Sequence, residues 1–160
     1  FEGVVQQITL VVAFQSLILD MAGNVGTQSL AVTIRVIMDE ALSKKDEHKL
    51  IFKEMRVGFT NGMILGMLAF VAIGVYILVF KGKSVPFSFS VSGCIGISLL
   101  FAMVVSSLVG TVVPLFFKKI NIDPAVASGP LITTVNDLVA VVSYYGIVWI
   151  LLINILQLVE

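Results

Sequence analysis

The stretch Asp20-Met21-Ala22-Gly23-Asn24-Val25-Gly26-Thr27-Gln28-Ser29 interrupts a long apolar run with an acid, two amides, two glycines and two hydroxyls. Residues 10–19 before it and 30–38 after it are mostly apolar. In a water-soluble protein this stretch would be an ordinary turn between buried elements. The composition argues against that reading, because 58% of the 160 residues are hydrophobic and only 12% are charged. Soluble domains carry about a quarter charged residues, so this chain has too little charge to cover a water-facing surface.

Four segments are long and apolar enough to cross a bilayer, which takes about 20 helical residues. They are residues 4–38, 57–80, 85–117 and 124–159, and half of the charged residues lie in 39–56. Helices are the form expected in lipid, because an open strand would leave its backbone groups unpaired there. The sequence therefore predicts an all-α membrane protein, a polytopic helical bundle. Residues 39–56 are expected to form a cytoplasmic loop or a short amphipathic helix.

Three of these spans are longer than one straight crossing requires, and each contains residues that disfavour a regular helix. These residues are Gly23 to Ser29, Ser106 to Pro114, and Gly129-Pro130 with Asp137. Kinked or broken helices are expected at these places, with the freed backbone groups facing protein or a water-filled cavity. The glycine pair in Gly62-Met63-Ile64-Leu65-Gly66 indicates close helix packing instead.

Positive charge is unevenly divided among the connectors. The first contains Lys44, Lys45, Lys49, Lys53 and Arg56, the third Lys118 and Lys119, and the second only Lys81 and Lys83. Because cytoplasmic loops are enriched in Lys and Arg, the first and third connectors are expected in the cytoplasm and both chain ends outside. The net charge of zero gives no reason to expect nucleic acid as a partner. Phe1-Glu2 carries no basic leader, so the numbering is expected to begin inside a larger protein.

Two acids, Asp20 and Asp137, lie within apolar spans and have no basic residue close by; Arg35 is about four helical turns from Asp20. Ionisable groups in a membrane usually face the bundle interior or an aqueous path. One explanation is a protonated aspartate that shares hydrogen bonds with neighbouring amides. A mobile cation accounts better for the absence of a fixed counter-ion.

The polar groups near these two acids offer oxygen atoms. They are the side chains of Asn24, Thr27, Gln28, Thr133 and Thr134. Magnesium and calcium take oxygen ligands, and magnesium tends to keep several of its waters. The chain has one cysteine, Cys94, and one histidine, so it has no cluster of the soft ligands that zinc and copper sites use. A hard divalent cation is therefore the expected ligand.

Two motifs carry a resemblance to a known family. Gly23–Ser29, followed by Arg35, resembles the signature of the MgtE family of magnesium channels. Asp123–Pro130, then Thr133-Thr134 and Asp137, resembles the start of that family's final transmembrane helix. The motifs occur in the expected order and at roughly the expected separation, so the resemblance covers nearly the whole chain.

The resemblance implies a homodimer in a bacterial inner or plasma membrane, with five transmembrane helices per subunit and a pore on the dimer axis. The chain would hold helices two to five, without the first helix and the cytoplasmic regulatory domains. Asp137 and the backbone carbonyl of Thr133 would hold hydrated Mg²⁺, with Mn²⁺, Co²⁺ or Ca²⁺ as alternatives. Asn24 and Asp20 complete the expected metal site, and the expected pore-lining residues are Gly23, Thr27, Gln28, Gly129, Pro130, Thr134 and Asn136.

Two departures from the family pattern bear on the ion. Met21-Ala22-Gly23 stands where Met-Gly-Gly is commoner, and Asp20 stands where many members carry an uncharged residue. A second acid near the pathway would add a cation site or change ion selectivity.

The expected function is a channel for passive entry of a divalent cation, most simply Mg²⁺. A gradient-coupled transporter or exchanger is the alternative that uses the same intramembrane acids. An intramembrane aspartyl enzyme would also need two acids, but its Gly-x-Gly-Asp motif is absent, because Asp137 follows Val135-Asn136. No enzymatic activity is expected. A purely structural membrane anchor would leave both acids unexplained.

Overall fold

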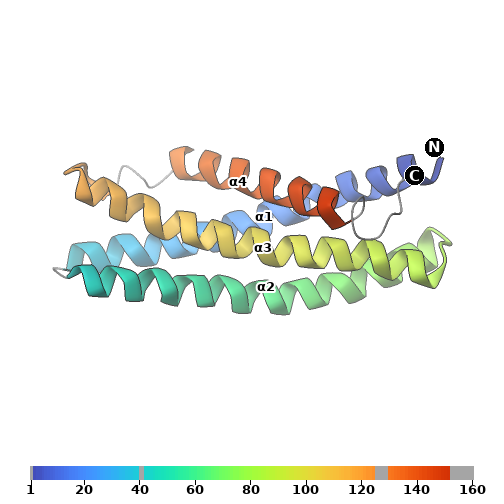
Figure 1. The fold of residues 1–160 in the computed structure, drawn as a ribbon, viewed down its shortest axis with the longest axis horizontal. Helices are drawn as coiled ribbons and strands as arrows, with labels where there is room; N and C mark the ends of the chain where they lie inside the picture. Colours follow the sequence, from blue (N-terminus) through green and yellow to red (C-terminus); the bar gives the residue numbers. More distant parts are fainter. Residues whose placement is uncertain (1, 40–41, 125–129, 152–160) are drawn as a thin grey trace.

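The computed structural model describes the backbone of residues 2–39, 42–124 and 130–151, and the side chains of residues 9–39, 42–124 and 133–151. Within these ranges the chain forms four long helices and no strand, which confirms the all-α fold. They are α1 (Glu2–Asp39), α2 (Lys44–Phe80), α3 (Val85–Lys119) and α4 (Pro130–Trp149). Figure 1 shows them side by side along one long axis, with the connector after α1 and the end of α3 at the same end of the bundle.

Among the described residues, three helical segments are long and apolar enough to cross a membrane: Thr9–Asp39 of α1, all of α2 and all of α3. At 1.5 Å per residue, the 37 residues of α2 extend over roughly 55 Å, against a hydrocarbon core of about 30 Å. The 20 residues of α4 have about the length of one crossing.

Helices α1 and α3 run through the places where breaks were expected. Both Gly23 to Ser29 and Ser106 to Pro114 are helical throughout. A glycine inside a helix costs only about 0.5–1 kcal/mol relative to alanine, and here the glycines allow contacts with neighbouring helices that offset this cost. The third place is different: α3 ends at Lys119 and α4 begins at Pro130, a residue type favoured at the first position of a helix.

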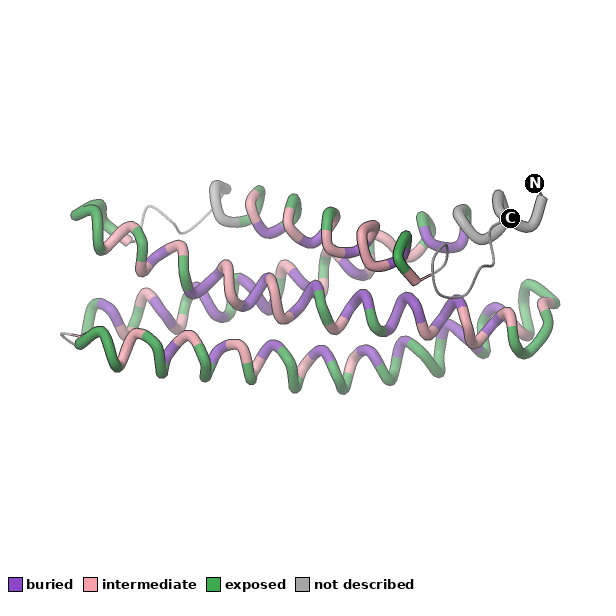
Figure 2. The backbone as a smooth tube through the Cα atoms, viewed as in Figure 1, coloured by how far each residue is buried: buried purple, intermediate pink, exposed green. Residues whose placement is uncertain are grey.

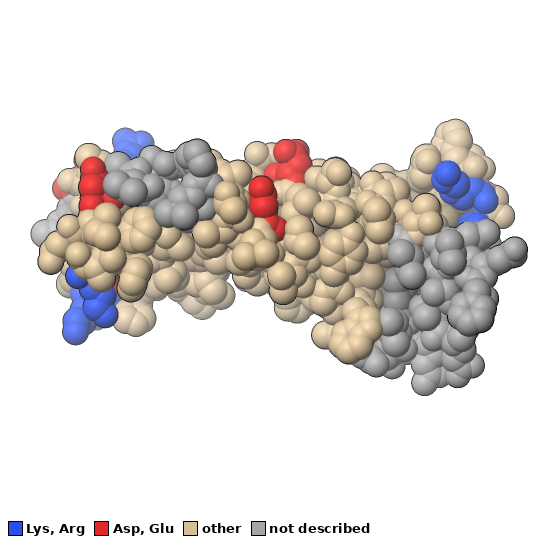
Figure 3. Space-filling model, turned by 90° about the horizontal axis from the view of Figure 1, so that it is seen from above, with Lys and Arg blue, Asp and Glu red and all other residues tan. Residues whose placement is uncertain are grey.

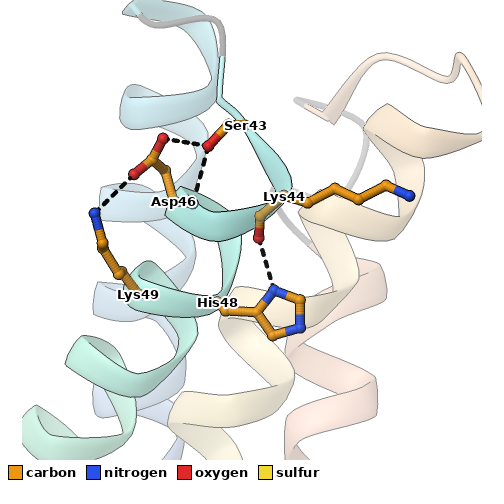
Figure 4. A network of polar contacts seen from close by, with 5 residues as sticks. All are labelled: Ser43, Lys44, Asp46, His48 and Lys49. Carbon is orange, nitrogen blue, oxygen red and sulfur yellow. Dashed lines mark hydrogen bonds and ion pairs between the residues drawn. The ribbon is translucent and has the colours of Figure 1, made fainter.

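The connector expected over residues 39–56 is much shorter, because α2 already begins at Lys44. Ser43 caps this helix: its side-chain oxygen accepts a hydrogen bond from the Asp46 backbone N–H, and its hydroxyl donates to the Asp46 carboxylate (Figure 4). Lys49 pairs with the same carboxylate at 3.1 Å. Because the cap lies at Ser43, the charged residues form the first turns of α2, and the apolar residues of the membrane span follow in the same helix.

Glycines bring α2 and α3 into backbone contact. A Cβ atom added at Gly66 would lie 2.8 Å from the Gly96 carbonyl oxygen, and one added at Gly96 would lie 2.7 Å from the Gly66 carbonyl oxygen. Gly62 packs in the same way against Leu100. The pattern Gly62-xxx-Gly66 therefore acts in packing, as expected. Buried residues form one stripe along the inner face of α2 (Figure 2).

Hydroxyl groups link the helices in the bundle interior. Ser106 Oγ donates to the Ala22 carbonyl at 2.7 Å, which joins α3 to α1. Tyr144 Oη donates to the Val11 carbonyl at 2.7 Å, which joins α4 to α1. These bonds satisfy buried polar groups where water is scarce, and the Tyr144 bond holds α4 against the half of α1 that precedes Gly23.

Candidate ion-binding groove

A groove of about 470 Å³ lies between α1 and α4 and gathers most of the expected site residues. Its described lining consists of Ser16, Leu19, Asp20, Gly23, Asn24, Thr27, Thr133 and Asp137. Six of these residues were expected from the sequence to hold the ion or line its path. The two acids of the apolar spans therefore line a single groove.

Helical periodicity explains why these residues meet. On α1, Ser16, Asp20 and Thr27 recur at intervals of four and seven residues, which places them on one face of a helix. On α4, Thr133 and Asp137 are four residues apart and share a face in the same way. The groove is thus one polar stripe of α1 opposite one polar stripe of α4.

The acid of α4 lies next to Gly23 of α1. A Cβ atom placed on Gly23 would lie 3.9 Å from Asp137 Oδ1. The Asp137 carboxylate therefore lies over the one part of the groove wall that carries no side chain. Next to it on α1, Thr27 donates its hydroxyl to the Gly23 carbonyl at 2.8 Å.

The charge of the two acids is not neutralised by the rest of the described chain. Asp20 and Asp137 are exposed, and neither forms an ion pair with any described residue. Arg35, on the same helix as Asp20, pairs with Asp39 at 3.9 Å instead. Figure 3 shows acidic atoms midway along one face, with basic atoms only toward the ends and further acidic atoms near one end. This arrangement attracts cations to the middle of the bundle.

The donor set suits a cation that keeps part of its water shell. The groove offers carboxylate, amide and hydroxyl oxygens, the ligand type that magnesium and calcium take. Among the described residues, no three His, Cys, Asp or Glu side chains come together as a metal cage. Two carboxylates and a few neutral oxygens match an ion that is held in part through water.

The other expected site residues are not part of the described lining. Gln28 and Thr134 are exposed but do not line the groove. Gly129 lies outside the described residues, and Pro130 is described only as the first residue of α4.

Asn136, expected to line the pore, is buried instead. One residue along a helix is a turn of about 100°, so it points away from Asp137, toward Gly26 and Ser106. Its two amide atoms have no hydrogen-bond partner among the described residues.

Two features of the polar pattern were missed in the sequence. Ser16 lines the groove, and its position four residues before Asp20 was the available signal. Glu54 was expected in a cytoplasmic connector, yet its side chain is buried on α2. It lies at four-residue intervals from Gly58 and Gly62, whose buried face it shares.

Comparison with known proteins assigns the chain to a family. The profile of the MgtE family, described as a divalent cation transporter, matches residues 15–147. This chain belongs to the MgtE family. Its helices and its relatives make it a multi-pass protein of the cell membrane.

Three curated relatives, each called magnesium transporter MgtE, align over most of the chain. The protein of Bacillus subtilis is 35% identical over 92% of this chain and 31% of its own length. The protein of Enterococcus faecalis is 37% identical over 92% of this chain and 30% of its own length. That of Thermus thermophilus is 30% identical over 95% of this chain and 32% of its own length. The chain thus spans about a third of the length of these MgtE relatives.

Proposed function

We propose that this chain forms the pore region of a divalent cation channel, that its main cargo is Mg²⁺, and that it carries out no enzymatic reaction. The observation that carries the proposal is the groove in which Asp20 and Asp137 lie together without a basic partner in the described chain. Membership of a family of divalent cation transporters supports the same reading. The proposed cytoplasmic regulatory domains and a first transmembrane helix would lie in the part of the relatives that this chain does not cover.

The proposed path runs along the groove and not through the middle of one bundle. Between the described helices the interior is filled by side chains with no exposed surface, such as Ile18, Leu99 and Met103. A polar groove turned toward lipid would be unfavourable. A second copy that placed its own groove opposite would cover both and enclose a wet path on a two-fold axis. We therefore propose a homodimer with the pore at its axis.

In the proposed pore, Asp137 is the main ion-binding group, with Thr133, Asn24 and Asp20 beside it. Two Asp137 carboxylates, one from each copy, would concentrate negative potential on the axis. A membrane potential of about 100 mV favours inward movement of a divalent ion by roughly 4.6 kcal/mol, twice the value for a single charge. Contacts made through water would keep binding weak enough for the ion to leave.

The test is Mg²⁺ uptake into liposomes by variants of Asp137. Asp137→Ala and Asp137→Asn are expected to reduce uptake to the level of empty liposomes, because both remove the carboxylate over Gly23. Asp39→Asn removes an exposed acid of the same helix as Asp20 but outside the groove, and uptake should persist. Unchanged uptake in both Asp137 variants would refute the proposed pore site.

The same liposomes separate a channel from a gradient-coupled exchanger. Uptake through a channel follows the imposed voltage and does not need a pH or sodium gradient. Uptake that stops when these gradients are removed at constant voltage would favour the exchanger.

A further inference from the structure

A second groove, of about 810 Å³, lies on the first half of α2 and is lined by basic side chains. Its described lining consists of Lys45, His48, Lys49, Phe52, Lys53, Arg56, Val57, Thr60 and Asn61. No acidic side chain belongs to this described lining. All of these residues lie on α2, at the end of the bundle where α3 ends.

Most of the positive charge of this basic groove is available to a ligand. Lys49 forms an ion pair with Asp46, as Figure 4 shows. Lys45, Lys53 and Arg56 form no ion pair with any residue of the described ranges. The groove therefore carries a net positive charge at the place where α2 enters the apolar part of the chain.

An apolar groove of about 280 Å³ follows between α2 and α3, deeper in the bundle. It is lined by Gly62, Met63, Gly66, Met67, Phe70, Gly93, Gly96, Ile97 and Leu100. Four of these lining residues are glycines, which carry no side chain to fill the groove. Its surface is almost entirely apolar, which suits a hydrocarbon chain.

One exposed stripe of α2 connects the basic groove to the apolar groove. Its members recur at intervals of three or four residues, as on one face of a helix, and are Phe52, Arg56, Phe59, Met63, Met67 and Phe70. Arg56 and Gly66 are ten residues apart, which is roughly 15 Å along the helix, or half of the ~30 Å hydrocarbon core. The apolar groove at Gly66 therefore lies about one leaflet's depth from Arg56.

We propose that the two grooves bind one anionic phospholipid of the leaflet on the Lys44 side. Its phosphate would contact Lys53 and Arg56, because guanidinium and ammonium groups are the usual partners of phosphate. One acyl chain would follow the exposed stripe into the groove beside Gly66. Basic clusters next to a transmembrane helix attract anionic headgroups by about 1 kcal/mol per charge. The proposal does not depend on the transported ion.

The test uses a tryptophan reporter and brominated lipids, which quench tryptophan on contact. Trp149, the only tryptophan of the chain, is replaced by Phe, and Phe59→Trp puts a reporter on the stripe. The full chain is reconstituted in phosphatidylcholine vesicles that contain equal fractions of brominated phosphatidylglycerol or brominated phosphatidylcholine. Phosphatidylglycerol is expected to quench this reporter at a much lower fraction than phosphatidylcholine does.

Three controls make the result specific. Phe116→Trp is a reporter on α3, exposed at the same end of the bundle but outside both grooves, and should show little preference. In the Phe59→Trp chain, Lys53→Gln with Arg56→Gln should weaken the preference for phosphatidylglycerol about 30-fold, the factor expected for two charges. The matched pair Lys118→Gln with Lys119→Gln, also at this end, should leave it nearly unchanged.

Each other result overturns the proposal. Equal quenching by the two lipids would show that no anionic lipid is selected. If the Lys53/Arg56 and Lys118/Lys119 double variants lost the same amount of preference for phosphatidylglycerol, the attraction would be a diffuse one to the membrane surface. A reporter shielded from both lipids would mean that another copy of the chain, or another protein segment, covers the grooves.

Discussion

At the scale of single residues, Gly26 sets how closely α4 approaches α1. A Cβ atom added there would lie 2.4 Å from Asn136 Nδ2 and 2.5 Å from Ser106 Oγ. Asn136 precedes Asp137, so a shift of α4 that relieves this contact also moves the acid of the ion-binding groove. We expect Gly26→Ala to lower the free energy of unfolding by about 1–3 kcal/mol, the usual cost of overpacking, and to reduce Mg²⁺ uptake.

Gly146→Ala is the matched control, since it adds the same methyl group to another helical glycine. No described atom lies within 4 Å of a Cβ at Gly146. Alanine is favoured over glycine in a helix by about 1 kcal/mol, so this variant should be as stable as the parent or slightly more stable. Unfolding of both variants in detergent micelles measures the difference; equal stabilities would show that the Gly26 contact does not constrain α4.

The polar residues that line the groove with the two acids could largely be predicted from the sequence, but the burial of the neighbouring amide could not. Asp20 and Asp137 stand out because a charge in an apolar span needs a partner or water. Asn136 carries no such signal, since an uncharged amide next to an acid in the sequence can equally line a groove or be buried. Its burial depends on the space above Gly26, which exists only after α1, α3 and α4 have packed.

At the scale of elements, the start of α2 depends on its cap. Ser43 accepts from the Asp46 N–H, whereas Ser84 at the start of α3 forms no side-chain cap. We expect Ser43→Ala to destabilise the first turn of α2 by about 1 kcal/mol and Ser84→Ala to change α3 little. Hydrogen exchange of the backbone amides in the two first turns measures this; equal effects would contradict a role for the Ser43 side chain.

The same turn should respond to acid. The hydrogen bond from Ser43, and then the hydrogen bond and charge of Lys49, hold the pKa of Asp46 below its ordinary value. A lowered pKa means that the folded turn favours the ionised carboxylate. Its contribution to stability is therefore complete above the ordinary aspartate pKa of about 3.9 and is lost as the pH falls through the lowered value. Amide exchange in this turn, corrected for its intrinsic pH dependence, should rise below about pH 4. In the Ser43→Ala variant this rise should be smaller.

The number and type of helices could be predicted from the sequence, but their continuity could not. Apolar length alone indicates four membrane segments. The run Gly23 to Ser29 looks like a break because glycines and polar residues disfavour an isolated helix. Close packing reverses this local preference, since Gly26 and Gly110 permit the contact between α1 and α3. Local composition around Gly26 does not reveal that Gly110, far along the chain, will pack against it.

At the scale of the whole molecule, the proposed homodimer makes a geometric prediction. Residues near a two-fold axis face their own copies, and Asn24 lies in the groove proposed to line that axis. With Cys94→Ala as background, Asn24→Cys should be joined into a dimer by a short thiol cross-linker. Val75→Cys, exposed on α2 and outside the groove, should not be. A cross-linked dimer for Val75→Cys alone would place the interface on the other side of the bundle.

The excess length of α2 has a consequence for anything that approaches from the Lys44 end. About 55 Å of helix against about 30 Å of hydrocarbon leaves roughly 25 Å outside it. The charged residues all lie in the first turns, so most of this surplus projects on one side. There the first turns of α2, beside the ends of α1 and α3, would project beyond the lipid headgroups, and an approaching soluble domain would touch protein before it reached the bilayer.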